Sequence, residues 1–530
     1  MLDSLPVEVI EKVVSYLPQR DRVSLVLVCK PLYHKVVPSL YRNLYLNVKP
    51  YCHSDLDPTL GSFWSVLYYS HKNEHKADEK FECLVRSLEE SPHICSLVRR
   101  IHCTWHLKKE TLYKLADIIT KNGINVTHFE NFLQMDIADR ISKIGVQLTS
   151  LDLPPPKTLP ADHIPISYLE KLKKLTDAYN MQNVTSLTIY IDPTYFFPNH
   201  HPLKHKLRIK NLCLSLRGDG YKPDAFPLNR LKYSDIFDTE YLEQLSILSW
   251  YEDEQVDLYE TFHLYELLEF TNIKEFSLLS LFPNDHFLVQ CIKKFHALER
   301  LKLDYMFDHP ISKDVVDIMA RSPCAATLQY LDVRLEELDP YIITIYQDEV
   351  SYFELNQVCK CEFCKQVFRD IVFKKYFPNQ SSLAINSFED VKSRHVLIQL
   401  FRLYPIIPYA QFVDKSPGIA FRARELEAFV IKTNELLNSK FLFYSYEKDE
   451  NPVTAQNIID VYHAHLHSMR RTYDFFLQRF HSLKFLTVNE VPTMVMNTTD
   501  GQKHNIPVFY NCNYQSNQVY EVVNDESLFD

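Results

Sequence analysis

A short apolar pattern repeats through the middle of the chain and constrains its fold more than any other feature. The pattern is apolar-x-x-apolar-x-apolar, as in LTSLDL at 148–153 and LERLKL at 298–303. Copies start 22 to 36 residues apart, at Val98, Val126, Leu148, Val184, Ile209, Leu242, Ile273, Leu298 and Leu328. The alternation within each copy predicts a short half-buried strand. Residues 41–46 fit a first strand of the series and residues 483–488 fit a last one.

Most of the gaps between these strands hold a segment of helical period, for example 110–121 and 166–179. Strand plus helix at this period is the signature of leucine-rich repeats, which stack so that neighbouring copies bury a shared core. The alternative is an α/β protein with a sheet of short buried strands. Its parallel core strands would be longer, and glycines would mark their turns. The chain has only 7 Gly in 530 residues, which favours the repeat array.

Residues 5–33, LPVEVIEKVVSYLPQRDRVSLVLVCKPLY, form an apolar segment with its own helix boundaries. Pro6 suits a first helical turn, Pro18 ends that helix, and Asp21 can cap the next one. Together with the residues up to Tyr41, the segment predicts about three short helices, too small a unit to bury many apolar side chains by itself. We therefore expect a partner to cover the unit. A helical cap on the following domain is the alternative.

This segment resembles an F-box. The F-box pattern of LPxE, YL, D, V[CS][KR] and L[WY] is matched by Leu5, Pro6, Glu8, Tyr16, Leu17, Asp21, Val28, Cys29, Lys30, Leu40 and Tyr41. The resemblance implies docking on the Skp-type adaptor of a cullin–RING ubiquitin ligase. It also implies eight adaptor-binding candidates, which are Leu5, Pro6, Ile10, Val14, Leu17, Leu25, Val28 and Leu40. One departure is Pro31, directly after VCK, which predicts an early end of the second helix.

F-box proteins carry a second region that binds a substrate. The repeats here resemble the irregular leucine-rich repeats of many fungal-type F-box proteins. The expected fold class is therefore α/β, with a short N-terminal helical F-box followed by an irregular leucine-rich-repeat solenoid that carries a helical insertion. The expected domains are the F-box at 1–46, the repeats at 81–339, a helical insertion with a cysteine cluster at 340–480, and a final strand, hairpin and acidic tail at 481–530.

The repeat geometry predicts a substrate-binding surface. In LxxLxL the apolar positions point inward, and the third, fifth and seventh positions line the concave face. The residues that this rule selects as substrate-binding candidates are Tyr190, Arg300, Lys302, Asp304, Tyr330 and Arg334. Arg and Tyr are enriched at interface hot spots, and an acidic or phosphorylated segment could pair with the basic members. Because Asp304 and Asp332 share the surface, an ordinary solvated face is the alternative.

The expected insertion contains three cysteines within one run of six residues, namely Cys359, Cys361 and Cys364. Their thiolates can supply three ligands to one tetrahedral zinc ion, and His395 or a distant cysteine is the expected fourth. Three unligated thiols are the alternative. The run of three histidines at 463, 465 and 467 is not expected to bind metal, because positions i and i+2 of a helix diverge.

Composition and charge exclude several classes of protein. The net charge is −10 and no dense run of Lys and Arg occurs, so no nucleic-acid partner is expected. No glycine-rich phosphate loop or nucleophile elbow is present in the sequence. No apolar run approaches the ~20 residues that cross a bilayer, and no signal-peptide pattern opens the chain. The 12 Cys are mostly scattered among apolar neighbours, which is typical of reduced thiols in a cytoplasmic or nuclear protein.

These features predict a substrate-recognition subunit of a Skp–cullin–F-box (SCF) ubiquitin ligase. Its partners would be the Skp-type adaptor, the cullin through that adaptor, and a protein substrate. The alternative is an F-box protein in an adaptor-bound scaffold outside any ligase, for example in organelle or chromosome attachment. An enzyme is the third hypothesis, but the sequence offers no catalytic residues, and no cofactor beyond a structural zinc is expected.

Overall fold

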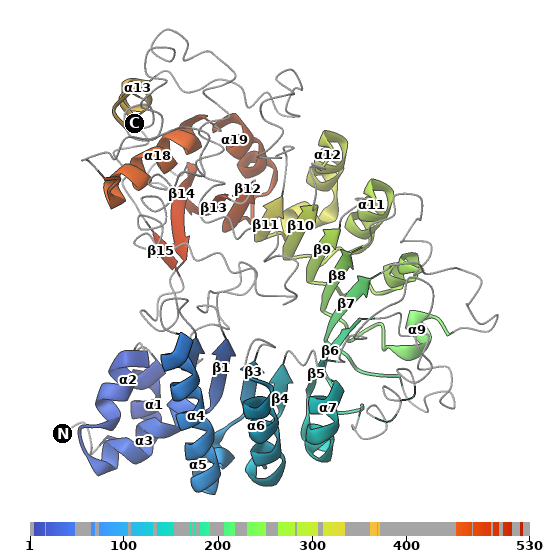
Figure 1. Ribbon diagram of the computed structural model, residues 1–530. Helices are drawn as coiled ribbons and strands as arrows, with labels where there is room; N and C mark the ends of the chain where they lie inside the picture. Colours follow the sequence, from blue (N-terminus) through green and yellow to red (C-terminus); the bar gives the residue numbers. More distant parts are fainter. Residues whose placement is uncertain are drawn as a thin grey trace. The chain divides into compact units, whose positions relative to one another are not determined.

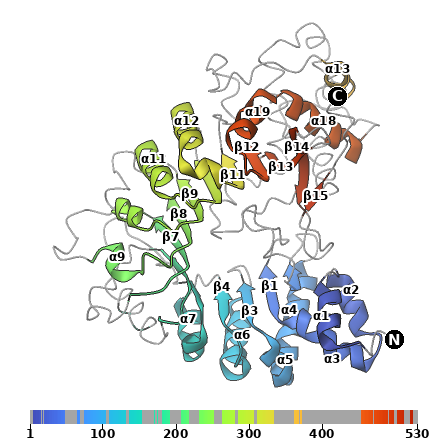
Figure 2. The ribbon, with the colours of Figure 1, turned by 180° about the vertical axis from the view of Figure 1, so that it is seen from behind.

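The computed structural model is shown in Figure 1 and from behind in Figure 2. It describes residues 5–47 (without 16 and 18), 65–68, 74–103, 108–130, 135–152, 170, 174, 181–190, 206–217, 231–250, 263–280, 284–305, 311–333, 361–371 (without 368), 452–488 (without 469), 491–497, 502–510 and 520–522. These residues form two compact units. Unit 1 comprises the described residues up to Phe276, and unit 2 those from Ser277 onward. Among them, no helix is long and apolar enough to cross a membrane.

Three short helices open unit 1: α1 (Val7–Ser15), α2 (Gln19–Val26) and α3 (Lys30–Tyr41). Both α1 and α2 pack against α3. Their small core consists of Ile10, Val14, Leu32 and Val36, with Leu5, Leu25, Val26 and Cys29 partly buried against it. The Nζ of Lys35 donates a hydrogen bond to the Leu5 carbonyl at 2.6 Å, which fixes the chain where it enters α1.

Two helix boundaries differ from the sequence expectation. Pro31 lies in the first turn of α3, where a proline is well tolerated because the backbone N–H groups of that turn have no intrahelical acceptor. It therefore begins a helix, and the expectation that it ends the second helix is wrong, since α2 already stops at Val26. Asp21 lies in the first turn of α2 and not at the cap, because the helix begins at Gln19.

The strands of unit 1 pair in parallel and, from β3 onward, each pairs with the next along the chain. Beyond the helices, β1 (Asn43–Asn47) pairs with β2 (Ser65–Tyr68) on one side and with β3 (Arg100–Cys103) on the other. The series continues with β4 (His128–Glu130), β5 (Ser150–Asp152), β6 (Ser186–Ile189), β7 (Asn211–Arg217) and β8 (Gln244–Trp250). β9 (Glu275–Ser280) spans the division between the units.

The repeated apolar pattern sets the register of these strands. Its fourth position pairs from strand to strand and is at most 4% exposed at Ile101, Phe129, Leu151, Leu187, Leu212 and Leu245. Its second position forms a backbone ladder, in which the Thr149 N–H donates to the Thr127 carbonyl and the Thr185 N–H donates to the Thr149 carbonyl, both at 2.8 Å. Each copy therefore places equivalent atoms one above another.

Helices and 3₁₀ turns fill the gaps between strands of unit 1. They are α4 (Glu74–Glu90), α5 (Pro92–Leu97), α6 (Lys109–Asn122), α7 (Met135–Ile141), η3 (Ser142–Gln147), α9 (Tyr233–Ile236) and η6 (Leu264–Glu269). The helix expected at 110–121 is confirmed as α6. Figures 1 and 2 show α6 and α7 along the same side of β3 to β5. The helix expected at 166–179 falls almost wholly outside the described residues.

Unit 2 continues the parallel pairing and then changes direction. β10 (Arg300–Tyr305), β11 (Tyr330–Val333) and β12 (Phe485–Val488) are parallel, although about 150 residues separate β11 from β12 along the chain. After them, β13 (Val491–Asn497), β14 (Lys503–Tyr510) and β15 (Tyr520–Val522) pair antiparallel. β13 and β14 are the two strands of the hairpin that the sequence predicts.

The described helices of unit 2 are α11 (Asp285–Lys294), α12 (Lys313–Arg321), η7 (Pro323–Ala326), α13 (Glu362–Val367), α18 (Ala455–Ser468) and α19 (Arg470–Arg479). Side-chain caps fix two of their starts. The Asn284 side chain accepts from the Phe287 N–H at 2.9 Å, and the Ser312 hydroxyl accepts from the Val315 N–H at 3.3 Å. Both α18 and α19 pack against β14, and α13 packs against α18.

Candidate functional site

Exposed apolar side chains gather on the three N-terminal helices. Of the nine large apolar side chains that are exposed among the described residues, seven belong to residues 7–33. This set, the apolar patch, consists of Val7, Val9, Val13, Val23, Leu27, Val28 and Tyr33. Leu27 and Val28, in the turn between α2 and α3, are 80% and 67% exposed. Covering one such side chain contributes roughly 1.5–3 kcal/mol, so this concentration is the candidate interaction surface among the described residues.

The structure divides the eight adaptor-binding candidates into three groups. Val28 belongs to the apolar patch and Pro6 is also exposed. Leu5, Leu17, Leu25 and Leu40 are half-buried. Ile10 and Val14, in contrast, are only 1% exposed, because they supply the core that α1 shares with α3. In this conformation a partner reaches the half-buried and exposed residues, and not these two.

A buried cation lies between two of the N-terminal helices. Arg22 of α2 is 2% exposed, and its Nη1 donates to the Ser39 carbonyl of α3 at 3.3 Å. Desolvation by burial lowers the pKa of this guanidinium. Burial also raises the pKa of the Tyr41 hydroxyl at the end of α3, and the nearby Tyr33 raises it further. The Arg22–Ser39 hydrogen bond thus links α2 to α3.

Three neighbouring strands of unit 2 carry a ladder of side chains on one face. Arg300, Tyr330 and Phe485 occupy one level of the strand register. The Arg300 guanidinium lies 4.4 Å from the centroid of the Tyr330 ring, and that ring stacks on Phe485 at 4.9 Å. On the next level, the Nζ of Lys302 lies 3.6 Å from a carboxylate oxygen of Asp332. We call these five residues the strand-face ladder.

Three of the six predicted substrate-binding residues belong to this ladder, and the other three do not. Arg300, Lys302 and Tyr330 are all members of it. Lys302 is only 7% exposed, however, and Asp332 neutralises its charge. Asp304 lies on β10, Tyr190 is 5% exposed in unit 1, and Arg334 lies outside the described residues.

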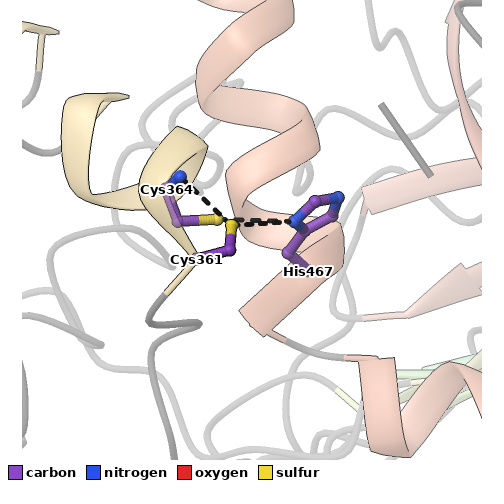
Figure 3. A group of neighbouring side chains, drawn as sticks. All are labelled: Cys361, Cys364 and His467. Atoms are coloured by element: carbon purple, nitrogen blue, oxygen red, sulfur yellow. Dashed lines mark hydrogen bonds between the residues drawn. The ribbon is translucent and has the colours of Figure 1, made fainter. Parts of the chain in front are cut away.

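Two of the three predicted metal ligands meet a histidine that the sequence did not select. Cys361 and Cys364 lie beside His467 of α18, as Figure 3 shows, with all three ligand atoms within 4.8 Å of one another. Cys359 and the expected fourth ligand His395 lie outside the described residues. The run of histidines at 463–467 was the available signal. Helical spacing argued against all three binding one ion, but it did not prevent one of them from joining the cysteines.

Comparisons with known proteins identify the segment that holds the three N-terminal helices. Residues 2–47 match the family model described as F-box-like. The chain is 30% identical over 563 residues to "F-box protein YDR131C" of Saccharomyces cerevisiae, with both chains covered completely. It is also 28% identical over 590 residues to "F-box protein DAS1" of the same yeast, covering 97% of this chain and 88% of that protein.

The chain thus combines a helical unit that carries exposed apolar side chains with a series of parallel strands. The full-length similarity then identifies the family, and the chain belongs to the F-box proteins. No enzyme family is indicated by these comparisons.

Proposed function

We propose that this protein is the substrate-recognition subunit of an SCF ubiquitin ligase, with the apolar patch as its docking surface for the Skp-type adaptor. The observation that carries the proposal is the concentration of exposed apolar side chains within the F-box-like residues 2–47. Leu27 and Val28 are the most exposed members of this group, and a partner that covers the group would remove its apolar surface from water.

We further infer that the parallel strands form an irregular leucine-rich-repeat array that holds the substrate. Support comes from the repeated buried position and from the backbone ladder that links equivalent residues of successive copies. Within unit 2, the strand-face ladder is the proposed contact surface. Arg300 and Tyr330 are its hot-spot candidates, because stacked Arg and Tyr side chains offer a large, pre-organised contact area.

The proposed mechanism is proximity. A receptor that binds the adaptor through one region and a target through another raises the effective concentration of target lysines near the ubiquitin-conjugating enzyme. This role requires no catalytic residue in the receptor. We place the protein in the cytoplasm, the nucleus or both, and the nine described cysteines, all free thiols, are compatible with a reducing compartment.

Affinity purification of the full-length chain from yeast tests the proposal. The wild type is compared with a Leu27→Asp/Val28→Asp double variant, which places two charges in the apolar patch. Because both side chains are exposed, the substitutions leave the small core of α1–α3 intact. Ile124→Asp is the matched control, since Ile124 is 65% exposed in unit 1 but lies outside the F-box-like residues.

The proposal predicts that the Skp-type adaptor and the cullin co-purify with the wild type and with Ile124→Asp, and that both are lost from the double variant. Recovery of the adaptor without the cullin would replace the ligase receptor by a scaffold role outside any ligase. Equal adaptor recovery with all three chains would place the docking surface elsewhere.

A further inference from the structure

The cysteines of α13 and a histidine of α18 form a compact cluster in unit 2. The Nδ1 of His467 lies 3.7 Å from the Sγ of Cys361 and 3.5 Å from the Sγ of Cys364. Figure 3 shows both sulfur atoms facing this one ring nitrogen. Cys364 is fully buried, whereas Cys361 is exposed at the edge of the cluster.

The helix start brings the two sulfur atoms together. Cys361 directly precedes α13, and its carbonyl accepts from the Lys365 N–H at 3.1 Å, which closes the first helical turn. Cys361 and Cys364 are three residues apart and therefore lie on one face of that turn. The Cys364 N–H donates to the Cys361 Sγ at 3.4 Å, a contact that stabilises negative charge on this sulfur.

The distances fit a tetrahedral zinc ion. With Zn–S bonds of about 2.3 Å and Zn–N bonds of about 2.0–2.1 Å, sulfur and nitrogen ligands lie about 3.6 Å apart. The two observed S–N distances of 3.7 and 3.5 Å bracket that value. Hydrogen bonding alone explains the arrangement less well, because one imidazole nitrogen offers either one lone pair or one proton and so satisfies one thiol at a time.

We propose that Cys361, Cys364 and His467 bind a structural zinc ion that ties α13 to α18. The donor set of two thiolates and one imidazole selects zinc over magnesium or calcium, which prefer oxygen ligands. The Phe363 ring, 5.7 Å from the His467 ring, packs beside the ligand and restricts its orientation. The described residues supply three of the four ligands that a structural zinc site takes.

This site closes a long loop. Residues 361 and 467 are 106 positions apart in sequence, and β11 and β12, which flank this stretch, pair directly. The ion would thus connect two helices, α13 and α18, that both lie in the stretch between β11 and β12. This role is independent of adaptor docking, so the site and the proposed function can fail separately.

Metal analysis of the full-length chain tests the proposal. The protein is purified with a histidine-free affinity tag, dialysed against trace zinc, and measured by inductively coupled plasma mass spectrometry. We expect about one zinc per chain for the wild type. The Cys361→Ser, Cys364→Ser and His467→Ala variants should each lose most of the metal. Cys83→Ser and His296→Ala, which change an exposed cysteine and an exposed histidine elsewhere, should retain it.

A wild-type chain without zinc, or zinc retained by all three site variants, would overturn the proposal. If the site variants are insoluble, cobalt substitution of the wild-type chain decides the question. Tetrahedral Co²⁺ bound by thiolates gives intense thiolate-to-metal charge-transfer absorption together with visible d–d bands. We expect both features. Their absence, or an intramolecular Cys361–Cys364 disulfide in the native chain, would refute the site.

Discussion

The strand-face ladder contains a buried ion pair between Lys302 and Asp332. Their side chains are 8% and 12% exposed, so each charge has lost most of its water. Removing one partner of such a pair leaves the other charge buried without compensation, which is strongly destabilising. The pair is therefore more important for the stability of unit 2 than for attracting a charged substrate.

We predict that Asp332→Asn lowers the free energy of unfolding by roughly 3 kcal/mol. The uncompensated Lys302 ammonium is the physical reason. Thermal unfolding of the full-length chain, followed by fluorescence, measures the effect as a lower apparent Tm. Asp474→Asn is the control, because its ion pair with Arg470 is more exposed and contributes little. Equal shifts for the two variants would contradict the account.

The environments of the cysteines differ in ways that affect the reactivity of a thiol. Burial raises the pKa of the Cys95 thiol to about 11 and also raises the pKa of Cys291. Cys83 and Cys361 are exposed. Alkylation requires the thiolate, so a buried thiol with a raised pKa reacts slowly at neutral pH.

We therefore predict that iodoacetamide labels Cys83 of the native chain rapidly and leaves Cys95 and Cys291 unmodified. Cys361 should be protected by the proposed zinc and should become reactive after a chelator is added. Peptide mass spectrometry before and after chelation measures both effects. Chelator-independent labelling of Cys361 would speak against metal ligation, while Cys83 provides the internal reference.

At the level of elements, the sequence pattern predicts strands better than it predicts surfaces. The apolar pattern located β3 to β12, because burial on one face of a strand requires alternation. It missed β2, whose SVLY segment carries no copy of the pattern. Among the adaptor-binding candidates that the F-box resemblance implies, Ile10 and Val14 lie in the core that α1 shares with α3. In α1 both helix faces are apolar, and periodicity alone does not tell the core face from the exposed one.

Gly123 ends α6 where space is restricted. A Cβ atom at this position would lie 2.6 Å from the Ile119 carbonyl oxygen and 3.0 Å from the Ile119 side chain. The Gly123 N–H also donates to that carbonyl at 2.8 Å, so the oxygen is fixed by the helix end itself. The close approach therefore requires glycine.

We predict that Gly123→Ala destabilises unit 1 by roughly 1–3 kcal/mol, the usual cost of overpacking. Limited proteolysis near the end of α6, together with the apparent Tm, reports the change. Asn122→Ala, at the neighbouring position of the same helix, should have little effect, because alanine has the higher helix propensity. A stabilised Gly123→Ala chain would show that the helix end is not under this constraint.

At the scale of the whole molecule, contacts between distant segments are what the sequence reveals only in part. The CxCxxC motif suggested zinc, yet its histidine partner lies 103 residues beyond Cys364. Local spacing carries no information about which of several distant histidines folds back onto the motif. The pairing of β11 with β12 across a long stretch is a distant contact that the sequence did indicate, because residues 483–488 carry the apolar pattern of the series.

If zinc links α13 to α18, removing the metal should lower the stability of the whole chain. In the chain-entropy model, a link across about 100 residues stabilises by roughly 4–5 kcal/mol. We predict that a chelator lowers the apparent Tm of the wild-type chain, while His467→Ala already unfolds at the lower temperature and does not shift further. A chelator shift of the same size in His467→Ala would mean that the stabilising metal binds elsewhere.

Reconstituted ubiquitination tests the central claim most directly. The full-length chain is mixed with the Skp-type adaptor, the cullin–RING module, a ubiquitin-conjugating enzyme, ubiquitin and ATP. A ligase receptor held near the conjugating enzyme should itself become ubiquitinated. We predict cullin-dependent modification of the wild type and of Ile124→Asp, and none of Leu27→Asp/Val28→Asp. If the wild-type chain binds the adaptor but is never modified, it is not a ligase receptor.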